Sequence, residues 1–262
     1  MKSRLITFDE QKQIQFTMLQ EIDSFCRVNG IRYSLAFGTL LGSIRHRGYI
    51  PWDDDIDIMM PLPDLLRFKH SFKSEKLKYC DVDSEEYYLF PFSRVAHKDT
   101  FKKRGICLKS YGICIDIYPI ITLPDTVEEQ EVFFRNAETL QKKRLFYVQL
   151  RSFLIKVLPI KTIIGFNRKM KRYRDYILLS NKYYEGKQAY YIIAGPLSLR
   201  EKMTYNKDLF CKMTTGWFEG KEFPIIAEYD YFLSLRYGDY MLLPPENQRH
   251  PYHGDKFYWR IK

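Results

Sequence analysis

The sequence predicts an α+β fold, in which a small mixed sheet packs with helices and is followed by an added helical segment. Short apolar runs with strand-like alternation concentrate before residue 125, and helical patterns dominate from about Val127 to Lys182. The 262 residues, 45% of them hydrophobic, are enough for one large domain or for a core with an appendage. We place the boundary at Pro124–Asp125, between a core of residues 1–124 and a mainly helical unit of residues 125–262 packed with it.

The predicted elements of the core alternate between helices and strands. Ile14, Met18 and Ile22 fall on one stripe of a helix over residues 8–29, which Gly30 ends. Further helices are expected over 39–47, 62–73 and 228–237, and strands over 32–37, 55–59, 77–83, 87–95 and 112–118. The core therefore runs from a strand through a turn and a helix to an acidic strand, with a second acidic strand later.

The first acidic strand carries carboxylates at alternate positions. Asp53 precedes it, and Asp55 and Asp57 alternate with Ile56 and Ile58. Successive side chains of a strand point to opposite faces, so Asp55 and Asp57 share one face while the isoleucines fill the other. Two carboxylates held side by side repel each other unless a divalent cation lies between them. The pattern predicts a metal platform.

Asp116 repeats this pattern between Ile115 and Ile117. An acid in the middle of an apolar strand is costly to bury without a partner, and a metal held by a neighbouring strand would supply one. The alternative is an acid at the rim of the sheet.

The residues between the first strand and the acidic strand suit an anion. Gly38 and Thr39 open a helix, where free backbone N–H groups and the helix dipole favour phosphate, although such a pair can also be only a helix cap. Arg45 and Arg47 lie on or just past this helix, where they either neutralise a diphosphate or are surface charges.

Three blocks of the chain resemble the LicD family of phosphocholine transferases. They are FGTLLGSIRHRGYIPWDDDIDI from Phe37, GICIDIYPI around Asp116 and LRYGDYMLLPPENQRH near the C-terminus, together about a fifth of the chain. The family is related to the fukutin-type transferases and is built on a nucleotidyltransferase fold like that of polymerase β. The resemblance therefore implies a polymerase-β-like nucleotidyltransferase core.

The resemblance also implies roles for single residues. Asp55, Asp57 and Asp116 would be the catalytic carboxylates and would hold Mg²⁺ or Mn²⁺, as two ions. Donor binding would fall to Gly38, Thr39, Arg45, Arg47, Trp52 and Arg94, and acceptor binding to Asp239 and Arg249 in a turn-rich lid. Family members often carry a Lys-x-Arg-Asp pattern near Arg94; here Ala96 and His97 follow, so the second basic position is lost.

The implied reaction moves phosphocholine from CDP-choline to a sugar hydroxyl of a cell-surface glycan precursor (lipopolysaccharide, teichoic acid or capsule) and releases CMP. Two alternatives stay open. The same fold could use CDP-ribitol, CDP-glycerol, a phosphoethanolamine donor or a nucleoside triphosphate. Otherwise the chain is a non-catalytic, glycan-binding protein of the membrane surface.

Charge and cysteines bear on location. The net charge is +10, and residues 142–174 carry eleven Lys or Arg and no acid, interleaved with apolar residues. This segment is either a solvated helical face or a contact with anionic lipid or a lipid-linked acceptor; no nucleic-acid module is visible. Five cysteines without a CxxC pair, no secretory signal and no long apolar run predict a cytoplasmic protein, and a lipid contact of residues 142–174 would place it on the inner face of the plasma membrane.

One pair of histidines is a weaker metal candidate. His250 and His253 lie three apart in a turn rich in Pro and Gly, but no second Cys/His pair lies nearby, so zinc is not expected.

Overall fold

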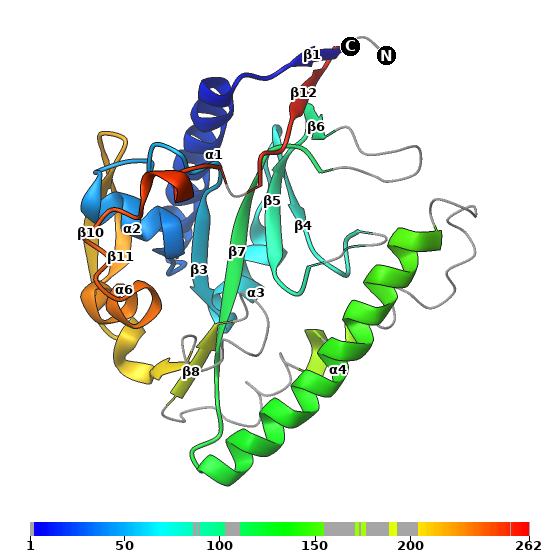
Figure 1. The fold of residues 1–262 in the computed structure, drawn as a ribbon, viewed down its shortest axis with the longest axis vertical. Helices are drawn as coiled ribbons and strands as arrows, with labels where there is room; N and C mark the ends of the chain where they lie inside the picture. Colours follow the sequence, from blue (N-terminus) through cyan, green and yellow to red (C-terminus); the bar gives the residue numbers. More distant parts are fainter. Residues whose placement is uncertain are drawn as a thin grey trace.

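The computed structural model describes residues 3–85, 88, 90–102, 111–154, 171–172, 174–176, 189–192, 204–251 and 253–261. Its helices are α1 (Phe8–Asn29), α2 (Phe37–Arg45), α3 (Leu62–Ser71), α4 (Val127–Leu154) and α6 (Tyr229–Tyr237), with short 3₁₀ turns η3 (Lys207–Phe210) and η4 (Glu246–Gln248). The fold is α+β, as predicted (Figure 1).

The strands form three sheets. They are β1 (Ser3–Leu5), β2 (Ser34–Leu35), β3 (Asp57–Pro61), β4 (Leu77–Cys80), β5 (Ser93–His97), β6 (Thr100–Lys102), β7 (Cys114–Thr122), β8 (Ala189–Ile192), β9 (Thr204–Asn206), β10 (Met213–Phe218), β11 (Lys221–Ile226) and β12 (Phe257–Arg260). The central sheet has the order β2-β3-β7-β5-β4, with β8 on the far half of β7 and β9 beside β8. Only the β3–β7 pair among these described strands is parallel, so the sheet is mixed.

Helix α1 forms where its local sequence predicts it. Thr7 and Glu10 make a reciprocal capping box at its start, and Gly30 ends it in the left-handed region at φ 59°. Its buried side packs on the core next to α3, where the Phe25 and Phe68 rings lie 5.6 Å apart edge to face. The isoleucines that alternate with the acids of β3 and β7 are fully buried in this same core.

Helix α2 is held from the other side by the hairpin β10–β11 (Figure 1). Glu219 and Gly220 both have positive φ, 50° and 77°, which matches the two-residue turn that suits a twisted hairpin. The hairpin is joined to β2 by a hydrogen bond from Ile226 N to Ser34 Oγ, at 3.1 Å. It therefore covers α2 and the edge of the central sheet.

The two ends of the chain build the third sheet, with the order β1-β12-β6 (Figure 1). Tyr258 on β12 pairs with Phe101 on β6 and with Leu5 on β1. This pairing returns the residues just before β12 to the middle of the molecule.

Several predicted boundaries were wrong. The first acidic strand begins at Asp57 rather than Asp55, and the strand expected over 87–95 is Ser93–His97. Residues 87 and 89 of the expected span lie outside the described residues. Local alternation shows that a strand exists, but the partner strand decides where it starts and ends.

The described part of the second half of the chain also contains strands. Strands β8 to β12 all lie after residue 125. Of these, β8 pairs with β7 and β12 pairs with β6, so sheets begun before the expected boundary at Pro124–Asp125 are completed after it. Such pairing depends on contacts distant in sequence, which local helical periodicity does not report.

The packing of α2 can be tested at Gly42. A Cβ added there would lie 2.4 Å from the carbonyl oxygen of Gly48, a backbone atom that cannot move freely. Ala is the better helix former by about 1 kcal/mol, but overpacking against backbone costs about 1–3 kcal/mol. We expect Gly42→Ala to lower the free energy of unfolding in urea. Val28→Ala, at a side chain 84% exposed, should change it by less than about 0.5 kcal/mol; equal stability of the two variants would contradict this packing.

Candidate active site

The two acidic strands lie side by side, and their acids face each other. Asp57 is the residue of β3 that pairs with Asp116 of β7 in the parallel register, and each is 8% exposed. The backbone N–H of Asp57 donates to Thr39 Oγ1 at 2.9 Å, which ties β3 to α2. Asp116 N donates to Ile56 O at 3.1 Å, so the pairing continues just before β3. Asp55 lies two residues before the start of β3, close enough to interact electrostatically with Asp57 and Asp116.

Burial and mutual repulsion disfavour the charged forms of these acids. Burial raises the pKa of Asp57, and the carboxylates of Asp55 and Asp116 raise it further. Burial, helped by Asp55, raises the pKa of Asp53 to about 8. Burial also raises the pKa of Asp116, although the Arg94 guanidinium opposes this.

Arg94 is the cation that contacts this group directly. Its Nε lies 2.6 Å from Asp116 Oδ1, and its Nη2 donates to Asp116 Oδ2 at 2.7 Å. The guanidinium also stacks 3.6 Å from the centre of the Phe90 ring. The structure thus places Arg94, a predicted donor-binding residue, in a two-point ion pair with a predicted metal ligand.

The residues present fit a divalent cation. Asp57 Oδ1 is buried and has no hydrogen-bond partner among the described residues. Native proteins rarely leave a buried carboxylate oxygen unpaired, because the lost hydration is not repaid. Asp55, Asp57 and Asp116 together present the oxygen ligands that Mg²⁺ and Mn²⁺ prefer. A cation between them would supply the missing partner and relieve the repulsion.

Gly38 lies at the start of α2, against the acids. A Cβ there would lie 2.6 Å from Asp53 Oδ2, so any larger residue would have to displace the Asp53 carboxylate. Phe37 before it has φ 45°, rare for a residue with a side chain, and its ring packs edge to face on Tyr118 at 4.9 Å. The guanidinium of Arg236 lies 4.5 Å from the same ring, a contact that the sequence did not predict.

Arg45 ends α2 and Arg47 follows it, and the structure shows neither of them in contact with the acids. Arg45 Nη1 donates to the carbonyl oxygens of Tyr240 and Leu242, at 2.6 and 3.0 Å. Arg47 is exposed, and its carbonyl oxygen accepts from Glu219 N at 3.0 Å. Arg45 thus fastens the turn-rich segment after α6, and its predicted contact with a donor stays a prediction, as does that of Arg47.

Trp52, predicted for the donor, and Arg249, predicted for the acceptor, lie together. The Arg249 guanidinium is 5.6 Å from the centre of a Trp52 ring, and its Nε donates to Pro244 O at 2.8 Å. The Trp52 ring therefore already faces a cation. Asp239 is exposed in the turn after α6.

Sequence reasoning missed the residues that close the site from the C-terminus. A cavity of about 210 Å³ is lined by Asp55, Arg94 and Asp116 together with residues from α1, β6, the segment before β12 and the start of β12. The latter are Gln11, Gln15, Lys102, His253, Asp255 and Phe257. The one available signal was the histidine pair, which spacing alone did not connect to the acids.

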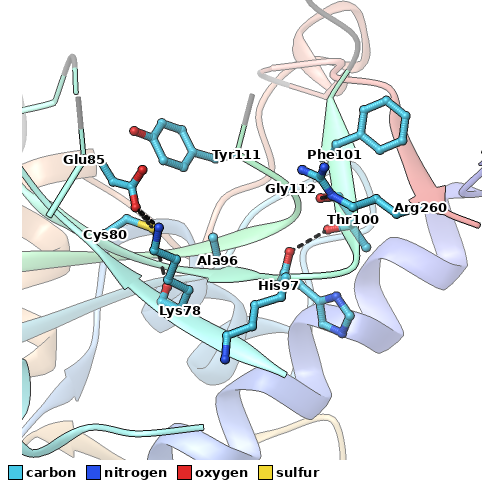
Figure 2. A pocket seen from close by; sticks show the side chains of 11 residues that line it. Lys78, Cys80, Glu85, Ala96, His97, Thr100, Phe101, Tyr111, Gly112 and Arg260 are labelled. Atoms are coloured by element: carbon cyan, nitrogen blue, oxygen red, sulfur yellow. Dashed lines mark hydrogen bonds and ion pairs between the residues drawn. The ribbon is translucent and has the colours of Figure 1, made fainter. Parts of the chain in front are cut away.

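A second cavity, of about 450 Å³, is lined by residues of β4, β5 and β6, among others (Figure 2). Ala96, in its wall, is two residues from Arg94 on β5 and so points to the same side of the sheet. Phe101 and Tyr111 line it, and Lys78 and Glu85 form an ion pair within it (Figure 2). The cavity thus combines aromatic rings with charged groups.

No helix in the described part of the chain is long and apolar enough to cross a membrane.

Comparison with known proteins identifies the family. Residues 30–160 match the family described as LicD/FKTN/FKRP, nucleotidyltransferase domain. The Lipopolysaccharide cholinephosphotransferase LicD of Haemophilus influenzae is 27% identical over 97% of this chain and 98% of its own length. An uncharacterised protein of Rickettsia typhi is 37% identical over 21% of this chain. The match covers every acid of the site from Asp53 to Asp116, and the chain belongs to the LicD/FKTN/FKRP family.

Proposed function

We propose that this chain transfers phosphocholine from CDP-choline to a hydroxyl of a cell-surface glycan and releases CMP. Family membership confirms the predicted enzyme class, a phosphotransferase. The observation that carries the proposal is the pairing of Asp57 with Asp116 across β3 and β7, in a chain similar over nearly its full length to a lipopolysaccharide cholinephosphotransferase. Buried facing acids are poor for stability and are suited to binding cations.

Asp55, Asp57 and Asp116 would hold two divalent cations, Mg²⁺ or Mn²⁺, whose charge would polarise the donor phosphate and stabilise the leaving CMP. A bond forms between the acceptor oxygen and the phosphorus that carries choline, and the bond from that phosphorus to the CMP oxygen breaks. One of the three carboxylates accepts the proton of the acceptor hydroxyl. Negative charge gathers on the equatorial phosphate oxygens.

The N-terminus of α2 is suited to binding the negatively charged donor phosphates. Its first backbone N–H groups lack partners within the helix, and the helix dipole adds positive potential. Gly38 lets the backbone come close, and Thr39 holds β3 at a fixed distance through Asp57 N. We therefore assign donor phosphate binding to Gly38 and Thr39.

We assign the choline of the donor and the acceptor sugar to different places around the acidic centre. The quaternary ammonium of choline is bound by aromatic faces, and we keep Trp52 as the candidate because a cation already stacks on it. The cavity of Figure 2 has Ala96 in its wall, two residues along β5 from Arg94, and we assign it to the acceptor sugar. Mixed aromatic and polar linings are typical of small-molecule sites.

Peripheral contact with the membrane through residues 142–174 stays a prediction. Lys171 and Arg174 pair with Asp83, so these two cations already have partners. Residues 155–170 and 173 of this segment lie outside the described residues.

The donor can be identified by competition. Incubating the protein with Mg²⁺ and a panel of CDP-choline, CDP-ribitol and CDP-glycerol should release CMP fastest from CDP-choline, because only choline carries a quaternary ammonium for an aromatic face. Release of CMP is followed by chromatography. Faster turnover of CDP-ribitol would refute the choline assignment and leave the family and the chemistry in place.

Removing one acid should separate activity from stability. We expect Asp57→Asn to lower CMP release at least about a hundredfold, the scale of losing one stabilising group of a transition state. Thermal stability without metal should stay equal or rise, because burial and neighbouring acids disfavour the Asp57 carboxylate. Asp9→Asn, an exposed change on α1, is the matched control and should leave turnover unchanged. Turnover of Asp57→Asn within a few-fold of the parent would contradict the proposed role.

Asp53 provides a test by pH. Its pKa is raised to about 8 in the folded protein, above its value in the unfolded chain. The folded state therefore binds more protons between about pH 4 and pH 8, and stability falls as the pH rises through that range. In EDTA, Asp53→Asn should unfold at a higher temperature than the parent at pH 9 and at nearly the same temperature at about pH 4. A difference that grows on acidification would show that Asp53 is stabilised in its charged form.

A further inference from the structure

The segment before β12 lies directly on the acidic centre. The pairing of Phe257 with Lys102 on β6 positions it, and Lys102 forms an ion pair with Asp255. Gly254 N donates to Asp54 Oδ2 at 2.9 Å, and His253 Nε2 lies 3.1 Å from Asp55 Oδ2. These contacts join residues that are about 200 positions apart in sequence.

Hydrogen bonds fix the position of Asp54 but leave one of its carboxylate oxygens without a partner among the described residues. Its side chain is 5% exposed, and its backbone oxygen accepts from Gln11 Nε2 at 2.6 Å and from Gln15 Nε2 at 3.2 Å. Oδ2 has the Gly254 hydrogen bond, but Oδ1 is buried and has no partner in the described part of the chain. A buried, unpaired carboxylate oxygen needs a compensating partner. The other acids of the site, Asp53, Asp55, Asp57 and Asp116, make the surroundings negative, so a cation is the favoured partner of this oxygen.

Asp54 also belongs to a compact group of three possible metal ligands. One carboxylate oxygen each from Asp54 and Asp55 and one ring nitrogen of His253 lie within 4.8 Å of one another. Adjacent ligands of one metal lie about 3 Å apart when the bonds are about 2.1 Å long, so small side-chain movements would complete the set. The His253 side chain is 45% exposed, which leaves room for such movement. The three residues line the same cavity as Asp116.

We propose that Asp54, Asp55 and His253 bind a divalent transition-metal ion next to the Asp55, Asp57 and Asp116 centre. Imidazole is a ligand for transition metals, whereas Mg²⁺ takes oxygen ligands and keeps its waters. His253 therefore makes this part of the site selective for a metal such as Mn²⁺ over Mg²⁺. The inference rests on the proposed function, because Asp55 is shared between the two ligand sets.

The experiment uses the full-length protein and Mn²⁺ as the probe. Pulsed electron paramagnetic resonance of the Mn²⁺-loaded parent should show ¹⁴N modulation from a directly bound imidazole. His253→Gln should lose that signal and bind Mn²⁺ at least about tenfold more weakly. His250→Gln is the matched control: His250 is exposed three residues earlier, with its ring near Pro251 O, and its replacement should keep both signal and affinity. Circular dichroism checks that both variants fold.

The outcomes separate the two proposals. Bound Mn²⁺ without ¹⁴N modulation in the parent would make His253 only a hydrogen-bond partner of Asp55 and would overturn the inference. The acidic centre would still stand if that Mn²⁺ were lost in Asp57→Asn. A ¹⁴N signal that survives in His253→Gln would also overturn it, because another histidine would be the ligand. A parent protein that binds no Mn²⁺ would overturn both the inference and the metal centre of the proposed function.

Discussion

The parallel pairing of β3 with β7 is the constraint on which the candidate site depends. It sets Asp57 across from Asp116, with both side chains largely buried, on strands about 4.8 Å apart. Like charges at this distance in a medium of low polarity repel unless protons or cations compensate them. On the alternate positions of the same strands, Ile58 and Ile117 are fully buried core residues. The isoleucine face of β3 and β7 thus stabilises the fold. The acidic face is suited to catalysis but lowers the stability of the folded protein.

The contacts that hold the acids come from distant parts of the chain. Thr39 on α2 accepts from Asp57 N, Arg94 on β5 grips Asp116, and Gly254 before β12 donates to Asp54. Each of these contacts fixes the position of one acidic residue, but together they do not neutralise the negative charge of the site. The site therefore needs the complete fold, including the terminal sheet, which returns the C-terminal segment to the acids. A shortened chain without β12 would lose one wall of the cavity.

The arrangement also separates the two substrates of the proposed reaction. Helix α2, with Gly38 at its start, contacts β3, and the second cavity has Ala96 of β5 in its wall. Donor phosphates on one side and a hydroxyl acceptor on the other would meet at the acids, as an in-line displacement requires. The C-terminal segment contacts the acids through Gly254 and brings the His253 ring to Asp55.

The sequence by itself determined what local patterns encode. Helix α1 has its cap, its apolar stripe and Gly30 within one continuous stretch, and the alternation around Asp55, Asp57 and Asp116 indicated both metal chemistry and the family. Only the tertiary structure decided the start of β3 at Asp57, the two-point grip of Arg94 on Asp116, the hairpin at Glu219 and the approach of His253 to Asp55. These depend on which strands pair and on contacts between residues up to about 200 positions apart. Local periodicity does not record such contacts, because each side chain meets its partner only after the whole sheet has formed.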